Sequence, residues 1–212
     1  DVKNPSQQFN FGTLFEGRVI LMGLIMGLIF MGMPAVGTFS PQYSREVGFS
    51  TAGVFLLMYS TGMIVSRFSI KRIFDNSNPQ IAGLFALFFI GAGFALTGFV
   101  RNAFGLIAGG GLMGLGYGTA NSTFTPLGWN LVEENKRGVC NSTFIFCQDV
   151  GIFVGMNLFG RVSQFYGSYA KANALYSIIV VVVIAIFLIF TVPDYRRKYA
   201  ILTETSDNLP ID

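Results

Sequence analysis

Long apolar stretches alternate with short polar segments along the sequence, and six of the apolar stretches reach or approach the length of a membrane span. A helix needs roughly 20 apolar residues to cross the hydrocarbon core, and it satisfies its own backbone polar groups there. The pattern therefore predicts an all-α membrane protein with six transmembrane helices. The expected spans are 19–40, 51–66, 80–100, 103–127, 139–162 and 173–193.

The segments outside these spans set the expected domain organisation. Residues 1–18 are polar to mixed and are expected to form a tail or linker, and residues 194–212 form a charged tail. The transmembrane bundle accordingly occupies 19–193. Within it, 41–49 is expected to be a short polar loop, and Arg101 and Asn102 a minimal one.

A short basic turn is expected at 62–75, between the second and third spans. Lys and Arg beside a span favour the cytoplasmic side, and six crossings place both termini on one side. Of the 14 lysines and arginines, most fall on the side of the termini. The four on the opposite side are Arg45, Arg101, Arg161 and Lys171. Both termini are therefore predicted to be cytoplasmic, in a multi-pass protein of the cell (inner) membrane.

Composition agrees with a membrane protein and argues against other classes. Apolar residues make up 52% of the chain and charged residues 12%, against roughly 25% charged in a soluble domain. The net charge of +3 comes from basic residues between the spans, so membrane topology explains it better than a nucleic-acid partner. The chain has no histidine, and Cys140 and Cys147 are about 10 Å apart along a helix, too far for a disulfide. We expect no enzymatic activity, no metal and no cofactor.

Glycine and proline interrupt the first and fourth spans. The first contains Gly27, Gly32, Pro34 and Gly37, and the fourth combines a ladder of glycines with Pro126. These two spans occupy matching positions in two groups of three helices. An interrupted pair of this kind predicts a transport site between two repeats. The alternative is that glycine and proline are simply more frequent in transmembrane helices than in soluble ones.

The segment from Gly62 to Arg72 resembles the loop signature of the Major Facilitator Superfamily. That signature is Gly, three residues, Asp, Arg, one residue, Gly, one residue and two basic positions, which Gly62, Arg67, Lys71 and Arg72 match. Ser66 stands at the Asp position, and Ser69 at the second Gly position. These departures are typical of the weakened copy in the second half of such proteins, and they argue against a gating salt bridge built on that Asp.

A second resemblance begins at Arg137-Gly138 and continues through Gln148-Asp149 to Gly155. It is similar to the eleventh helix of efflux-type, drug/proton antiporter-like members of the superfamily. The combined resemblance covers nearly all of 14–195, and it implies the C-terminal six-helix half of such a transporter. Spans one and four would then line the central cavity, two and five would contact the other half, and three and six would face lipid.

The same resemblance implies the partners and the activity. The protein would lie in a lipid bilayer and pair with an N-terminal six-helix half, supplied by the same protein, by a second chain or by self-association. It would move a small-molecule substrate by alternating access, with proton-coupled efflux as the expected mode. The alternative is a non-transporting half that serves as a membrane assembly or regulatory module.

Polar and aromatic side chains inside the spans are the candidates for the substrate cavity, because polar groups in lipid are costly unless they meet partners or water. The candidates are Met33, Thr38, Phe39, Tyr59, Asn121, Thr123 and Gln148. Asp149 is the only acid well inside a span, and it shares a helix face with Phe153 and Met156 rather than with the glycines. It is either a proton-coupling carboxylate or a hydrogen-bonded group that locks two helices together.

Overall fold

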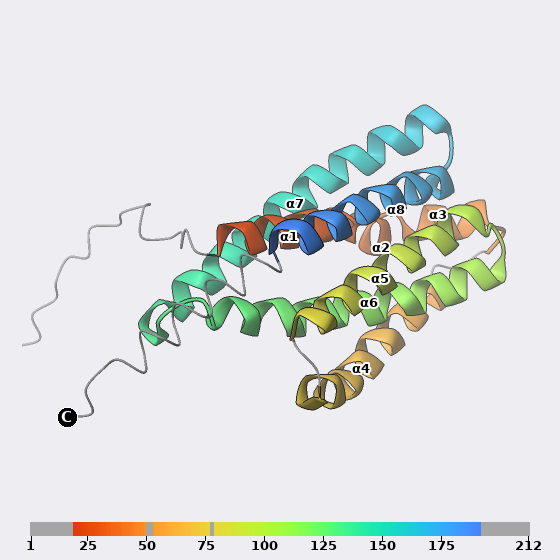
Figure 1. The fold of residues 1–212 in the computed structure, drawn as a ribbon. Helices are drawn as coiled ribbons and strands as arrows, with labels where there is room; N and C mark the ends of the chain where they lie inside the picture. Colours follow the sequence, from red (N-terminus) through yellow and green to blue (C-terminus); the bar gives the residue numbers. More distant parts are fainter. Residues whose placement is uncertain (1–18, 50–52, 77–78, 192–212) are drawn as a thin grey trace, which may run out of the picture.

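A computed structural model describes residues 19–49, 53–76 and 79–191, and within these ranges the protein is helical, without strands (Figure 1). The helices are α1 Ile20–Phe30, α2 Met33–Gly37, α3 Ser40–Glu46, α4 Gly53–Asn76, α5 Pro79–Phe99, α6 Ala103–Trp129, α7 Arg137–Tyr166 and α8 Tyr169–Ile186. A 3-10 turn at Glu134–Lys136 precedes α7, and a π-helix at Phe187–Thr191 continues α8. The predicted tails lie outside the described residues.

The predicted all-α membrane fold is confirmed. Among the described residues, four segments are long and apolar enough to cross a membrane, namely Ile20–Gly37, Gln80–Phe99, Glu134–Tyr166 and Tyr169–Ile189. The other two long helices, α4 and α6, are long enough to cross a membrane but have a less apolar composition. Helix α4 is apolar only over Gly53–Phe68, and α6, with 27 residues, is rich in glycine.

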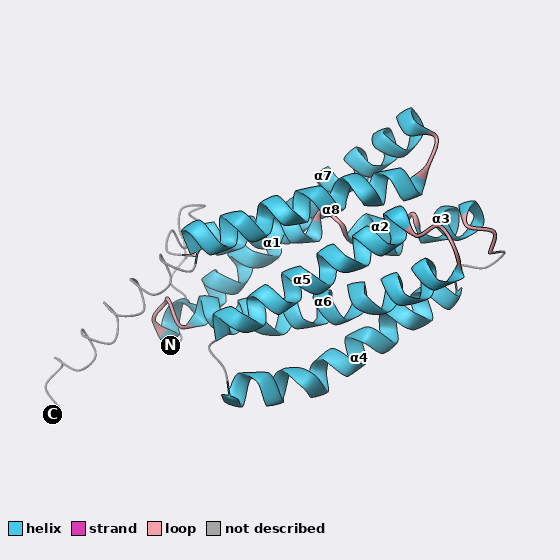
Figure 2. Ribbon diagram, turned by 45° about the vertical axis from the view of Figure 1, so that its right-hand side comes forward, coloured by secondary structure: helices cyan, strands magenta, loops and turns pink. Residues whose placement is uncertain are grey.

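The long helices alternate in direction, so the start of α1 and the end of α8 lie at the same end of the bundle (Figure 1). Helix α7 forms one edge and α4 the opposite edge, with α1, α5, α6 and α8 between them (Figure 2). Helix α1 packs on α7 and α4 packs on α6, while α5 contacts both α6 and α8. Helix α1 begins the first three-helix group and packs on α7, the middle helix of the second group. Helix α6 begins the second group and packs on α4, the middle helix of the first. This exchange is expected for two related repeats.

Glycines bring these helices into backbone contact. On α6, a side chain at Gly114 would contact the Tyr59 carbonyl of α4, and one at Gly116 would lie 2.7 Å from the Ile90 nitrogen of α5. Small residues allow such approaches, and close packing drives helix association in lipid. Helix α6 is continuous through these glycines and through Pro126, which lies in its last turn. The prediction that the fourth span is interrupted is therefore wrong, because its glycines serve packing.

Two predicted loops are helical instead. The expected basic turn at 62–75 belongs to α4, which continues to Asn76 because no proline or glycine follows Gly62 until Pro79 begins α5. The expected polar loop at 41–49 contains α3, in which Pro41 occupies the first turn. Proline fits that position because the first helical N–H groups need no partner.

The minimal loop at Arg101 and Asn102 is confirmed. The Asn102 side chain accepts a hydrogen bond from the Gly105 backbone N–H at 3.0 Å and caps the N-terminus of α6. We expect Asn102→Ala to lower the free energy of unfolding by about 1 kcal/mol, because the cap is lost. Thermal unfolding in detergent would measure this, and Asn135→Ala, at an exposed residue of the 3-10 turn, is the control. Equal stability of the two variants would contradict the capping role.

Candidate functional site

The first span is interrupted at Gly32, as the sequence predicts. Helix α1 ends at Phe30 and α2 begins at Met33, with Pro34 in its first turn. A Cβ atom at Gly32 would lie 2.6 Å from the Tyr117 hydroxyl and 2.7 Å from the Phe94 ring, and it would also contact the Tyr176 ring. Only glycine leaves room for these three rings, so the break is surrounded by aromatic side chains from α5, α6 and α8.

Two buried tyrosines bind the carbonyl groups at the end of α1. The Tyr117 hydroxyl donates to the Ile29 carbonyl at 3.0 Å. The Tyr176 hydroxyl donates to the carbonyls of Leu28 and Ile29, at 2.6 and 2.7 Å. Unpaired backbone groups are costly in an apolar interior, so these bonds stabilise the interrupted helix. Both tyrosines are absent from the sequence-based candidates, although each is a polar aromatic residue inside a predicted span.

Met33 and Tyr59 are brought together at the edge of this cluster. The Tyr59 hydroxyl lies 3.6 Å from the Met33 sulfur and is positioned to donate to it. The Tyr59 ring lies 6.4 Å from the Tyr117 ring, and the Phe30 ring lies 5.6 Å from Tyr117 on another side. These two candidates therefore belong to one continuous aromatic cluster around the helix break.

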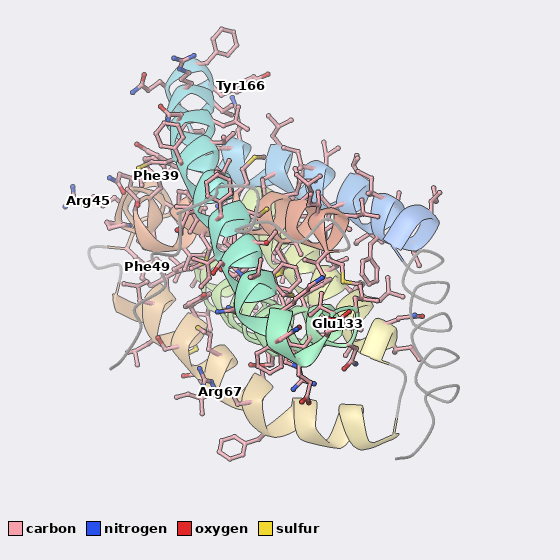
Figure 3. All side chains as sticks on the ribbon, turned by 90° about the vertical axis from the view of Figure 1, so that its left-hand side faces the viewer. Phe39, Arg45, Phe49, Arg67, Glu133 and Tyr166 are labelled. Carbon is pink, nitrogen blue, oxygen red and sulfur yellow. The ribbon has the colours of Figure 1, made fainter. Side chains whose placement is uncertain are left out.

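Thr38 and Phe39 lie further along, between α2 and α3. Thr38 is exposed, and the half-buried Phe39 ring lies 5.7 Å from the ring of Tyr169, the first residue of α8. Figure 3 shows Phe39 on the same side of the molecule as Arg45 and Phe49. These two candidates are thus near the end of the bundle and apart from the cluster at Gly32.

Asn121 and Thr123 point in different directions, because residues two positions apart on a helix are separated by about 160°. Thr123 is fully buried, and its hydroxyl has no hydrogen-bond partner among the residues that the structure describes. Asn121 is exposed. It lies angularly between Gly118, which contacts Ser66 of α4, and Gly128, which contacts Phe144 of α7. Asn121 therefore faces the space between α4 and α7.

Asp149, the candidate proton-coupling residue, lies on the exposed side of α7. Gly151 and Gly155 contact the α1 backbone at Gly27 and Met31, as the glycine face predicts. Asp149, about 160° from Gly151, is exposed. Its face neighbours Phe153 and Met156 are 70% and 44% exposed. Gln148 is half-buried at the border of the two faces. The Asp149 carboxylate is therefore exposed among exposed apolar side chains on this face of α7.

Some residues of the loop signature pack inside the bundle, and others are exposed on its surface. Gly62 packs against the Gly111 carbonyl, and the buried Ser66 hydroxyl donates to the Met63 carbonyl at 2.7 Å. Arg67 is exposed, on the surface of α4 (Figure 3). Lys71 and Arg72 lie in α4, but their side chains are outside the described part of the structure. In that part, no group of three or more Cys, Asp or Glu could hold a metal ion.

Comparisons with known proteins place the chain in a family. The Major Facilitator Superfamily matches residues 2–156. The Staphylopine export protein of Staphylococcus aureus (strain Mu50 / ATCC 700699) is 25% identical over 183 residues, which cover 84% of this chain and 46% of that protein. The chain thus spans about half the length of this relative. With the interrupted first span and the glycine-packed helix pairs, these matches show that the chain belongs to the Major Facilitator Superfamily.

Proposed function

We propose that this chain is the C-terminal half of a secondary transporter that exports a small organic solute by alternating access. The observation that carries the proposal is the open side between α4 and α7, where Asn121 and Asp149 are exposed and Gln148 is half-buried. Polar and ionisable groups at membrane depth face a cavity or a partner, because exposure to lipid is costly. The name of the matched relative supports export as the direction.

The missing wall of the cavity is a second six-helix half that contacts α4 and α7. These two helices form opposite edges of the bundle (Figure 2). A partner that contacts both helices would enclose the space between them, which Asn121 faces. Large apolar side chains are exposed on both edges, including Leu56 on α4 and Val154 on α7, which lies on a different face of the helix from Asp149. The partner half comes from the same protein, from a second chain or from a second copy.

Both termini are assigned to the cytoplasmic side of the cell (inner) membrane. The C-terminal part of α4 and the start of α7, where Arg137 is the first residue, lie at the same end of the bundle as the start of α1 and the end of α8 (Figure 1). Arg101 and Lys171 lie at the other end, near the loops between α5 and α6 and between α7 and α8. The basic residues next to the spans favour the first end as cytoplasmic.

Asp149 is the proposed proton carrier. We expect Asp149→Asn to reduce proton-driven export at least tenfold without changing the melting temperature, because an exposed carboxylate contributes little to packing in this half. Liposomes that contain this chain together with its N-terminal half, and that carry an imposed pH gradient, would measure export. Glu133→Gln, in an exposed loop, is the matched control.

Each outcome separates the proposal from an alternative. Undiminished export by Asp149→Asn would remove the residue from the coupling step. A melting temperature that falls together with export would assign Asp149 to locking helices together. Failure of the assembled wild-type protein to move any solute would favour the assembly or regulatory module. Export by Glu133→Gln should be unchanged, and this would show that the effect is specific to the acid inside the span.

A further inference from the structure

A groove of about 310 Å³ lies between α5 and α8, at the end of the bundle opposite the start of α1. Its floor is a close contact between small residues, since a Cβ atom at Gly98 would lie 2.5 Å from the Ala174 nitrogen. Its walls are Phe99 on α5 together with Leu175 and Ile178 on α8. This groove is distinct from the open side between α4 and α7.

The walls of the groove are apolar and open to the surroundings of the bundle. Phe99 is 70% exposed and Ile178 is 57% exposed. Lys171, Leu175 and Ile178 follow each other at intervals of four and three residues, so they form one stripe along α8. The stripe covers about 10 Å from Lys171 to Ile178, which is the length of a substantial part of an acyl chain.

Two cations and a tyrosine occupy the end of the groove. Arg101 and Lys171 both line it and are exposed, and neither forms an ion pair with any residue that the structure describes. The Lys171 ammonium lies 5.9 Å from the centre of the Tyr166 ring, which leaves its hydrogen-bond donors free. The groove therefore combines an apolar surface with two positive charges at one end, which form no ion pair among the described residues.

The nearby carboxylate of Glu46 has its own partners. It accepts hydrogen bonds from the Ser168 hydroxyl and from the backbone N–H groups of Tyr169 and Ala170, at 2.6 Å for Tyr169 and 3.3 Å for Ala170. These donors are the first turn of α8, where a negative charge is stabilised. Glu46 therefore neutralises the helix terminus, and the side chains of Arg101 and Lys171 remain available.

The position of the two cations matches the level of lipid headgroups. Helix α5 has 21 residues and is about 32 Å long, close to the thickness of the hydrocarbon core. Arg101 follows its last residue by two positions, and Lys171 is the third residue of α8. Both charges thus lie where the apolar surface of the bundle ends.

We infer that this groove binds an anionic phospholipid, with the phosphate between Arg101 and Lys171 and one acyl chain against Phe99, Leu175 and Ile178. The apolar surface selects a lipid over a soluble anion, and the two cations select an anionic headgroup over a zwitterionic one. Opposite charges attract at short range in either leaflet, so the two cations favour a headgroup with a net negative charge.

Native mass spectrometry of the full chain in neutral detergent tests this inference, with equal amounts of phosphatidylglycerol and phosphatidylcholine that have identical acyl chains. We expect phosphatidylglycerol to dominate the bound lipid. In the double variant Arg101→Gln/Lys171→Gln its affinity should fall about thirtyfold, as expected for two surface cations. Arg161→Gln is the matched control, since Arg161 is an exposed arginine of α7 that lines a different pocket.

A second pair of variants tests the apolar surface while both charges are kept. Leu175→Trp fills the groove and should displace the lipid, whereas Val181→Trp, at an exposed position of α8 outside the groove, should not. Unchanged phosphatidylglycerol binding in the double glutamine variant, or an equal loss in Arg161→Gln, would overturn the inference. Equal affinity for soluble glycerol 3-phosphate would overturn the assignment to a lipid.

Discussion

Gly151→Leu will prevent the chain from folding into its native bundle, and little monodisperse protein will be recovered from membranes. A Cβ atom at Gly151 would contact the carbonyl oxygen of Gly27 and would lie 2.7 Å from its carbonyl carbon and 2.9 Å from its Cα. These are backbone atoms of α1, so no side-chain rotation relieves the overlap. We expect a loss of more than about 3 kcal/mol, because α1 and α7 must separate. Size-exclusion chromatography and thermal unfolding in detergent measure it.

The same helix supplies the control for this prediction. At Gly160 of α7 the nearest atom to an added Cβ is the ring of Phe39, at 3.8 Å, which is an ordinary contact. Gly160→Ala should therefore behave like the wild-type protein, and Gly151→Ala should already be impaired. If Gly151→Leu gave a monodisperse protein with a normal melting temperature, the close packing of α1 on α7 would be wrong.

Removing the hydroxyls of both Tyr117 and Tyr176 should give the second largest effect. The double variant Tyr117→Phe/Tyr176→Phe keeps the aromatic packing around Gly32 but leaves the Leu28 and Ile29 carbonyls without these donors. We expect the free energy of unfolding to fall by about 2 kcal/mol. Export by the assembled transporter should fall as well, because the geometry of the interrupted span is no longer fixed.

Tyr59→Phe is the control for the double variant, because within the described residues the hydrogen bond of its hydroxyl goes to the Met33 sulfur, at 3.6 Å. A sulfur acceptor is weak, so its loss should change stability by a few tenths of a kcal/mol. Each single variant, Tyr117→Phe or Tyr176→Phe, should show a smaller effect than the double, since one donor still reaches Ile29. A double variant as stable as Tyr59→Phe would show that the two hydroxyls do not stabilise the break.

The apolar stretches predict the fold class and the approximate positions of the six rods, because lipid requires long helices and the sequence shows their length directly. The ends were less well predicted. The basic residues after Gly62 indicate the end of a membrane span, but they do not stop a helix, so α4 continues to Asn76. Pro41 suggests a loop, yet it occupies the first turn of α3, where proline is accepted.

Glycine has two structural roles in this bundle, and the sequence alone does not distinguish them. At Gly32 it permits three rings to surround a helix break, whereas at Gly114 and Gly151 it permits backbone contact within continuous helices. The difference depends on the residues opposite each glycine, and these come from other helices. A proline two positions after Gly32, within an apolar stretch, is the local signal that distinguishes the true break.

The candidate site was predicted in part. The helical periodicity of α7 correctly places Asp149 on a different face from Gly151 and Gly155, because this depends only on 100° per residue. The same periodicity separates Asn121 from Thr123. The tyrosine pair at Ile29 could not be predicted, since Tyr117 and Tyr176 are 88 and 147 residues from their acceptor and no local pattern joins them.

In the proposed transporter, the side of α7 that carries Asp149 faces a water-filled path, whereas the exposed side of α8 faces lipid. Spin labels at Met156 of α7 and Val181 of α8, with the native cysteines replaced, test it in membranes containing the assembled transporter. Collisions with a water-soluble nickel complex should relax the label at Met156, and dissolved oxygen should relax the label at Val181. Oxygen-dominated relaxation at both positions would place the Asp149 face in lipid and contradict the account.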